Sequence, residues 1–464
     1  MTALDLPLNP RRLRPVALLV AAMAVVLASY GVAAFRAAPP STVNTRGAAN
    51  GTSPNDVTLD APGAPALAIG SIEQIDHSIS IWTANLARES RDFYSATNLG
   101  LLYEARARLT GDIADYDRAR QATAEALTIE PTEMTARVVH ARVLASLHDF
   151  AAALAEARAI ITDDPTQLPA LATVGDSELE LGDVAGAATS YEALAKAAPG
   201  AAVDARLSRL AFIQGRPADA WELALRAHDE ASRDGSTGPG LSWYSYVLGT
   251  LATTSGQPAD ALDWFQRAVT DWPGSFLAHA GVARAEASLG RTAAAIVDYQ
   301  AAIAIAPQPD AVAALGDLYA IQGSTVLATR QYATVEAIAH LAALNQQVFN
   351  RQLVLFSVNH DRDLAQALVL AQQELTVRKD AYGYDAVAWA LLANGQASEA
   401  DTAIRQAMAF GTVDPLFEYH AGLIAQALGQ TDRARELLTS ALGATGAIDP
   451  LATSRAQAAL ASLR

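Results

Sequence analysis

The feature that most constrains the fold of this chain is a repeat of 34 residues. Prolines fall 34 residues apart in two series, Pro131, Pro165 and Pro199, then Pro273 and Pro307. Glycines recur in the same phase with single-residue drift, at Gly256, Gly290, Gly323, Gly395 and Gly429. This period accommodates two helices and a turn, and one such unit cannot bury its apolar face alone. The spacing therefore predicts an all-α solenoid of stacked helix pairs.

The clearest unit spans residues 242–273 and carries small and large residues at regular places. Leu248 and Gly249 are a large–small pair in its first helix, Gly256 occupies the turn, and Pro273 ends the unit. The second helix carries a small–large–small set, Ala261, Phe265 and Ala268. Small residues let two helices approach closely, and a turn glycine adopts a backbone angle that other residues avoid. This pattern resembles the tetratricopeptide repeat family.

The resemblance extends over most of the chain and implies a right-handed superhelix of about nine to ten units within residues 94–450. The units are expected at 94–131, 134–165, 168–199, 201–231, 242–273, 276–307, 310–340, 344–377, 382–410 and 415–442. In the first unit the insertion LTGDIADY predicts a turn lengthened by seven residues. Amphipathic segments at 71–93 and 451–464 predict capping helices at the two ends, which a solenoid needs for solubility.

The N-terminus resembles a membrane anchor. Three arginines, Arg11, Arg12 and Arg14, precede an uncharged apolar run, so that residues 15–35 predict a transmembrane helix of about 30 Å. The charge bias places residues 1–14 in the cytoplasm and the rest outside it. Cleavage of a signal peptide near Ala33, followed by secretion, is the alternative. Residues 36–70 are rich in Pro, Gly, Ala and Thr and predict a flexible linker.

Charge and composition narrow the classes of partner. The chain has a formal charge of −16 with 33 basic and 49 acidic residues, and residues 1–50 account for five arginines against one aspartate. Such an acidic body argues against nucleic-acid binding, which requires basic surfaces. The absence of cysteine excludes disulfides, thiolate metal sites and a cysteine nucleophile. An acidic surface favours a basic partner, or serves solubility alone.

No constellation for catalysis, cofactor or metal binding emerges from the sequence. The eight histidines lack metal-ligand spacing, and there is no phosphate-binding glycine loop. His360, Asp361, Arg362 and Asp363 form the one polar cluster of note, and their place at a repeat turn predicts a solvated turn. We therefore expect no enzymatic activity, no cofactor and no metal.

Partner binding is expected in the concave groove. The resemblance places groove residues at the second, fifth, ninth and twelfth places of a unit. In the clearest unit these are Trp243, Tyr246, Thr250 and Thr253, and the ninth places of other units are Arg142, Asp176, Arg284 and Asp317. The alternative is that Trp243, Tyr244 and Tyr246 pack against the loop at 232–240. The lysine–asparagine–arginine clamp that some family members use for peptide carboxylates is not supported here.

These features predict a bacterial, membrane-tethered scaffold in the cell envelope that binds protein or peptide partners. Two alternatives remain at this stage. The chain can serve as an assembly or quality-control factor for an exported or membrane-embedded complex, or as an accessory or small-ligand-sensing component of an envelope system. The sequence leaves the partner and the oligomeric state open.

Overall fold

The computed structural model describes residues 72–344 and 351–463. The chain divides into two units, 1–54 and 55–464, and all described residues belong to the second. Over the described ranges every regular element is an α-helix, and none of these helices is long and apolar enough to cross a bilayer. The predicted transmembrane helix at 15–35 and the linker at 36–70 lie outside the described residues.

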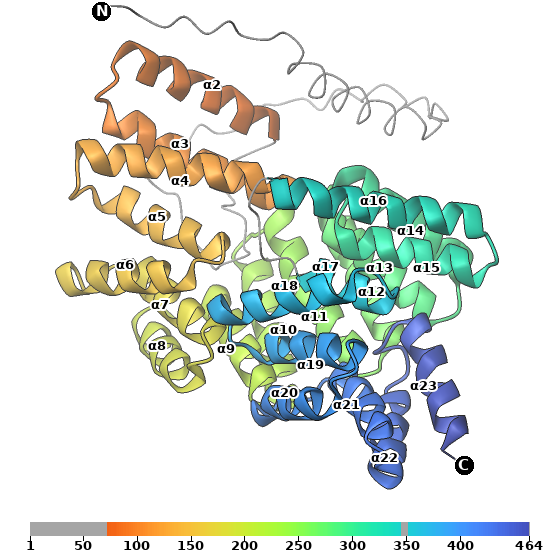
Figure 1. Ribbon diagram of the computed structural model, residues 1–464. Helices are drawn as coiled ribbons and strands as arrows, with labels where there is room; N and C mark the ends of the chain where they lie inside the picture. Colours follow the sequence, from red (N-terminus) through yellow and green to blue (C-terminus); the bar gives the residue numbers. More distant parts are fainter. Residues whose placement is uncertain (1–71, 345–350, 464) are drawn as a thin grey trace, which may run out of the picture. The chain divides into compact units, whose positions relative to one another are not determined.

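The helices follow one another with short connections (Figure 1). The first half of the chain contains α2 (Ile72–Arg88), α3 (Phe93–Thr110), α4 (Ile113–Ile129), α5 (Met134–Ser146), α6 (Phe150–Asp163), α7 (Leu168–Glu180), α8 (Val184–Ala197), α9 (Ala201–Ile213), α10 (Pro217–Arg233), α11 (Pro239–Thr254) and α12 (Pro258–Asp271). The second half contains α13 (Phe276–Ser288), α14 (Thr292–Ile305), α15 (Pro309–Ile321), α16 (Thr325–Leu344), α17 (Arg351–Asn359), α18 (Leu364–Val377), α19 (Ala381–Ala393), α20 (Ala397–Ala409), α21 (Pro415–Ala427), α22 (Thr431–Gly443) and α23 (Pro450–Ser462).

Helices α3 to α22 form ten consecutive pairs, from α3–α4 to α21–α22, and each pair packs on the next. This arrangement confirms the predicted all-helical solenoid. Helix α2 packs on α3 through the buried Ile75 and Ile79, with Trp82 and Leu86 beside them. At the other end α23 packs on α22 and α21.

The turn inside each pair requires a left-handed backbone. Glycine supplies it in eight pairs, and its φ is +85° at Gly182 and +71° at Gly256, for example. In the two pairs without a turn glycine, His148 (φ +64°) and Asp361 (φ +52°) adopt the same conformation. The turn geometry is thus kept even where the residue is unfavourable for it.

Close crossings within and between pairs explain the small residues. The ring of Phe265 lies against both Gly249 and Gly281, and a Cβ atom on Gly249 would come within 2.6 Å of it. The ring of Tyr191 lies equally close to Gly175. One large ring thereby fills the space that two backbones leave between them.

The predicted long turn in the first unit is wrong. The insertion LTGDIADY is absorbed by the helices, since α3 runs to Thr110 and α4 begins at Ile113. Only Gly111 and Asp112 connect them, with Gly111 in the left-handed region and Asp112 accepting a bond from the backbone of Ala114. The added residues lengthen both helices because Asp112 provides an N-cap immediately after the glycine.

The helix pairs also contact pairs far away in the sequence. The turn of one pair lies against the loop that follows the pair five places further along. The backbone contacts are Gly182 with Lys379, Gly215 with Gly411, and Gly256 with Ala444. Two hydrogen bonds support them: Lys379 N–H donates to Glu180 O (2.9 Å) and Thr412 Oγ1 donates to Ile213 O (2.9 Å). We call this line of contacts the seam.

Candidate functional site

The candidate site is a cavity of about 370 Å³ on the first helices of three successive pairs. Helices α7, α9 and α11 supply most of its walls, and Tyr382 at the start of α19 reaches it from beyond the seam. We call this cavity the groove. Its lining residues are Asp176, Tyr191, Ala205, Arg206, Ser208, Arg209, Phe212, Trp243, Tyr246, Val247, Thr250, Leu251, Thr254 and Tyr382.

Four of the eight predicted partner-binding residues come together in the groove. They are Asp176 from α7 and Trp243, Tyr246 and Thr250 from α11. Their helical spacing explains the convergence, because positions three and four apart lie on one face of a helix. The structure therefore brings together, from two helices, residues that the sequence analysis had predicted separately in two units.

The three aromatic residues of α11 have different surroundings. Tyr244 is buried among Ala205, Ala227 and Ala231, so it belongs to the core. Trp243 stacks edge-on against Tyr244, and Tyr246 lies against the ring of Phe265, while both keep a face toward the groove.

The remaining predicted residues do not line the groove. Thr253 is buried, and its hydroxyl donates to the Gly249 carbonyl within α11. Arg142, Arg284 and Asp317 lie on other helices. Arg142 is buried in an ion pair with Glu104 of α3. Burial acts to lower the pKa of Arg284, but the neighbouring Tyr246 and Tyr299 raise it overall. Asp317 accepts hydrogen bonds from the Tyr332 hydroxyl and from His360 Nε2, both at 2.7 Å. These side chains stabilise contacts between neighbouring pairs.

The expectation of a solvated turn at His360 is wrong for the histidine itself. Its side chain is only 10% exposed, bonds to Asp317, and lies against the rings of Tyr332 and Phe356. Asp361 is exposed, as expected of a turn residue. The histidine faces inward because the end of α17 packs against α15 and α16.

A hydrogen-bond network forms the polar floor of the groove. Asp176 accepts from the Tyr191 hydroxyl (2.8 Å) and from Arg206 Nε (3.1 Å). All three side chains are largely buried, and the network orients the Arg206 guanidinium along the floor. The carboxylate of Asp176 is thereby engaged by protein donors.

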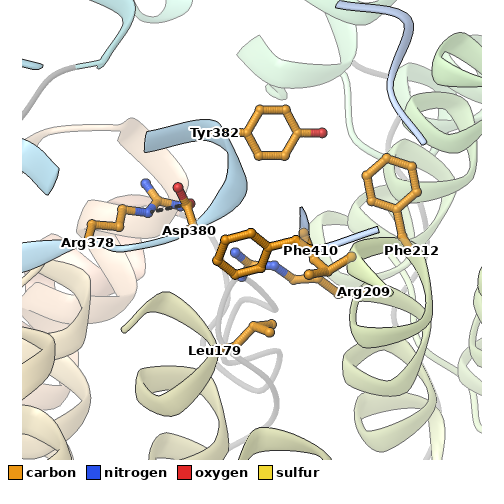
Figure 2. Close-up of a pocket in the computed structure, with 8 residues that line it drawn as sticks. Leu179, Arg209, Phe212, Arg378, Asp380, Tyr382 and Phe410 are labelled. Atoms are coloured by element: carbon orange, nitrogen blue, oxygen red, sulfur yellow. Dashed lines mark ion pairs between the residues drawn. The ribbon is translucent and has the colours of Figure 1, made fainter. Parts of the chain in front are cut away.

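A second cavity of about 220 Å³ adjoins the groove at the seam. We call it the junction pocket, and Figure 2 shows its aromatic rings around Arg209. Its lining residues are Leu179, Arg209, Phe212, Ile213, Arg378, Asp380, Tyr382 and Phe410. Arg209, Phe212 and Tyr382 line both cavities, so the two spaces share a wall.

Buried charges connect the junction pocket to the seam. Glu180 at the end of α7 pairs with Arg209 of α9 and with Arg378 from the far side of the seam. Burial acts to raise the pKa of Glu180, but the two guanidinium groups prevail and lower it to about 2. Asp380 pairs with Arg351 (2.9 Å) and Arg378 (3.1 Å), which completes a chain of alternating charges.

The sequence reasoning missed Arg209, Phe212 and Tyr382. Arg209 and Phe212 occupy the ninth and twelfth places of the α9 unit, counted back from its turn at Gly215. Tyr382 occupies the second place of the α19 unit, counted from Gly395. Extending the positional rule to every unit would have found all three. Only the seam, however, brings Tyr382 next to α9.

Comparison with protein-family models identifies the repeat. Residues 174–235 and 246–311 match the model described as tetratricopeptide repeat. Both segments are tetratricopeptide repeats. All residues that line the groove lie in these two segments except Trp243 and Tyr382. No curated protein matches the sequence of this chain.

Several solved structures are similar to this chain at low sequence identity. A chain of the human IFIT1 dimer with m7Gppp-AAAA is 16% identical to this chain. The TM-score is 0.47, and the similarity covers 73% of this chain and 76% of that one. PilW, a type IV pilus biogenesis factor, is 18% identical with a TM-score of 0.38 over 44% of this chain and 93% of that one. A chain of the APC/C hetero-tetramer Cut9–Hcn1 is 14% identical, with a TM-score of 0.31 over 84% of this chain and 93% of that one.

Chemically, the groove is suited to binding. It offers aromatic faces, two guanidinium groups and hydroxyls, and no histidine of the described ranges lines it. Four histidines pair instead with carboxylates on other helices, as His420 does with Asp385 at 2.7 Å. Rigid aromatic and arginine side chains in a partly enclosed site are typical anchors for partner binding.

Proposed function

We propose that the chain is a scaffold that binds a peptide segment of a protein partner in the groove. The observation that carries this proposal is the convergence of Asp176, Trp243, Tyr246 and Thr250 on one cavity. Tetratricopeptide repeats are a fold typical of protein–protein interaction, and stacked units present such concave surfaces to extended ligands. The aromatic anchors supply apolar area with little loss of side-chain entropy.

We also propose that residues 15–35 tether the scaffold to a membrane with the repeats on the extracytoplasmic side. The support comes from the sequence, since three arginines precede an uncharged run long enough to span a bilayer. The full-length chain should then sediment with membranes and resist extraction at high pH. A variant without residues 1–36 should remain in the soluble fraction. Equal partition of the two forms would contradict the tether.

The binding proposal is tested by photo-crosslinking in intact cells with the full-length chain. A benzoylphenylalanine residue at position 246 replaces one aromatic ring of the groove by another. The matched control carries the same residue at Gln266, an exposed position on α12 of the same unit. We expect a discrete adduct from position 246, its loss when Trp243 is changed to alanine, and no such adduct from position 266.

The same experiment can contradict the proposal. Identical adducts from positions 246 and 266 would assign the partner to another surface of the solenoid. An adduct from position 246 that survives Trp243→Ala would show that the tryptophan packs against α9 and α10 without contributing to binding.

A further inference from the structure

We propose that the groove and the junction pocket together select an acidic peptide segment, in which an internal Asp or Glu lies between two aromatic or branched aliphatic side chains. This inference rests on the proposed peptide-binding function and names the chemistry of its ligand. The residue that reads the carboxylate is Arg209.

Arg209, which lines both cavities, has hydrogen-bond donors that no acceptor of the described residues engages. Its side chain is 50% exposed, and only Nη2 is engaged, by Glu180. Among the described residues no acceptor contacts its Nε or Nη1. Since a guanidinium offers donors in a planar fork, the free side of Arg209 matches a carboxylate.

The carboxylates of the site are already engaged by protein donors, so they are less able than Arg209 to bind a charged ligand. Asp176 already accepts from Tyr191 and from Arg206. Asp380 accepts from Arg351 and from the backbone N–H of Gly383 (2.6 Å). Their side chains are also less exposed than that of Arg209, at 13% and 9%. The accessible charge in the site is therefore positive.

Aromatic residues line both of the cavities that contain Arg209. Phe212, Tyr382 and Phe410 surround Arg209 on the side of the junction pocket, as Figure 2 shows. Trp243 and Tyr246 line the groove, the second cavity that Arg209 lines. Because Arg209 lines both cavities, a ligand bound to it has apolar space before and after its carboxylate. This arrangement favours an internal acidic residue over a chain terminus.

The position of Tyr382 is held by α21, which lies on the same side of the seam. Its hydroxyl donates to Asp414 at 2.7 Å, and its ring packs edge-on against Phe417. The wall that it forms is therefore rigid. In a chain with a formal charge of −16, the site also differs from its surroundings, because an acidic ligand is repelled elsewhere.

The inference is tested with capped peptides and the full-length protein in detergent, by calorimetric titration. The probe contains Phe-Ser-Glu-Ser-Phe, in which alternate side chains of an extended chain share one face about 7 Å apart. Two analogues carry Gln or Lys in place of Glu. We expect the Glu peptide to bind at least ~10-fold more tightly than the Gln peptide, and the Lys peptide to bind most weakly, because charged hydrogen bonds contribute more than neutral ones.

Two variants separate the contributions of charge and rings. In Arg209→Gln the Glu and Gln peptides should bind equally, whereas Trp243→Ala should weaken both by the same factor. The matched control is Arg158→Gln, since Arg158 also pairs with a buried glutamate, Glu178, but lies on α6 outside the site. That variant should keep the full preference for Glu. Thermal unfolding of each variant verifies that it is folded.

The possible outcomes distinguish this inference from the function on which it rests. Binding of all three peptides with equal affinity, or a preference for Lys, would overturn the acidic ligand and leave a peptide-binding groove. Failure of every peptide to bind, while partner crosslinking from position 246 is also absent, would overturn both. A preference for Glu that persists in Arg209→Gln would assign the recognition to another residue.

Discussion

Single residues in the left-handed backbone conformation show that this chain keeps its turn geometry even where the turn residue is not glycine. The turn between paired helices needs a positive φ, and Asp361 adopts it without the freedom of glycine. For a residue with a side chain the left-handed region costs roughly 1–2 kcal/mol, somewhat less for Asp. Asp361 is exposed, so burial of its side chain does not offset this cost.

The Asp361→Gly variant should therefore be more stable than the wild type, by about 0.5–1 kcal/mol. The matched control is Gly323→Ala, at an equivalent turn where no atom lies within 4 Å of the added Cβ. That change introduces the same backbone cost and should lower stability by about 1 kcal/mol. Urea unfolding midpoints measure both effects, and a shift of equal sign would contradict the argument.

His148 occupies the other turn that lacks a glycine, and we expect it to make the stability of the protein depend on pH. Burial, and then the charge of Arg378, lower its pKa from 6.5 to about 4. The unfolded chain consequently binds a proton between pH 6.5 and 4 that the folded chain does not. The histidine's contribution to stability is complete above pH 6.5 and is lost as the pH falls toward 4, by about 3 kcal/mol.

The comparison with His148→Asn isolates this effect, because asparagine tolerates the left-handed conformation and does not titrate. Unfolding measured at pH 7.5 and pH 4.5 should show a larger loss for the wild type than for the variant. His279, whose pKa is raised chiefly by its hydrogen bond to Asp298, acts with the opposite sign and is present in both proteins. Parallel curves would refute the role of His148.

At the scale of elements, the helix pairs depend on a small residue facing a large ring. A methyl group on Gly249 would meet the ring of Phe265, which is fully buried and also touches Gly281. Gly249→Ala should therefore destabilise the protein by about 1–3 kcal/mol, as overpacked cores generally do. Gly443→Ala, at the end of α22 with no atom near the added methyl group, should leave stability within about 1 kcal/mol. Thermal unfolding distinguishes the two.

The elements were largely predictable from the sequence because each repeat signals its own boundaries. Turn glycines, and rings such as Phe265 opposite small residues, predicted the helix pairs. The insertion that ends at Tyr116 was wrongly predicted to lengthen the turn, because local sequence patterns do not distinguish a longer loop from two longer helices. The site was predictable in part, since Trp243, Tyr246, Thr250 and Asp176 follow from position in the repeat. The positional rule also marks Tyr382, but it does not place this residue beside α9, because that proximity depends on the seam, which joins residues almost 200 positions apart.

At the scale of the described repeats, the seam sets this array apart from a simple stack. In a solenoid each unit contacts only its neighbours, so unfolding spreads from the ends. Here the buried Glu180 joins Arg209 on the near side to Arg378 on the far side. Distant units are thereby coupled, and the described repeats should unfold more cooperatively than an open array.

The Glu180→Gln variant should lower the free energy of unfolding by about 1.5–3 kcal/mol, because Arg209 and Arg378 lose the charged hydrogen-bond acceptor that they share. Amide hydrogen exchange should increase on both sides of the seam, in residues 178–184 and 377–383. The control Asp163→Asn breaks an ion pair with Arg137 in which the aspartate is 57% exposed, and should cost less than about 1 kcal/mol. Exchange that increases near residue 180 alone would contradict coupling across the seam.

The seam also has a mechanical consequence. An open superhelix behaves as a spring whose coils separate smoothly when its ends are pulled. In this chain successive coils adhere through the backbone contacts at Gly182, Gly215 and Gly256. Such a spring resists small loads almost as a solid rod and then lengthens abruptly when the adhesion fails. A tensile load on the repeats would thus be transmitted almost without extension, up to a threshold set by a few buried charges and glycines.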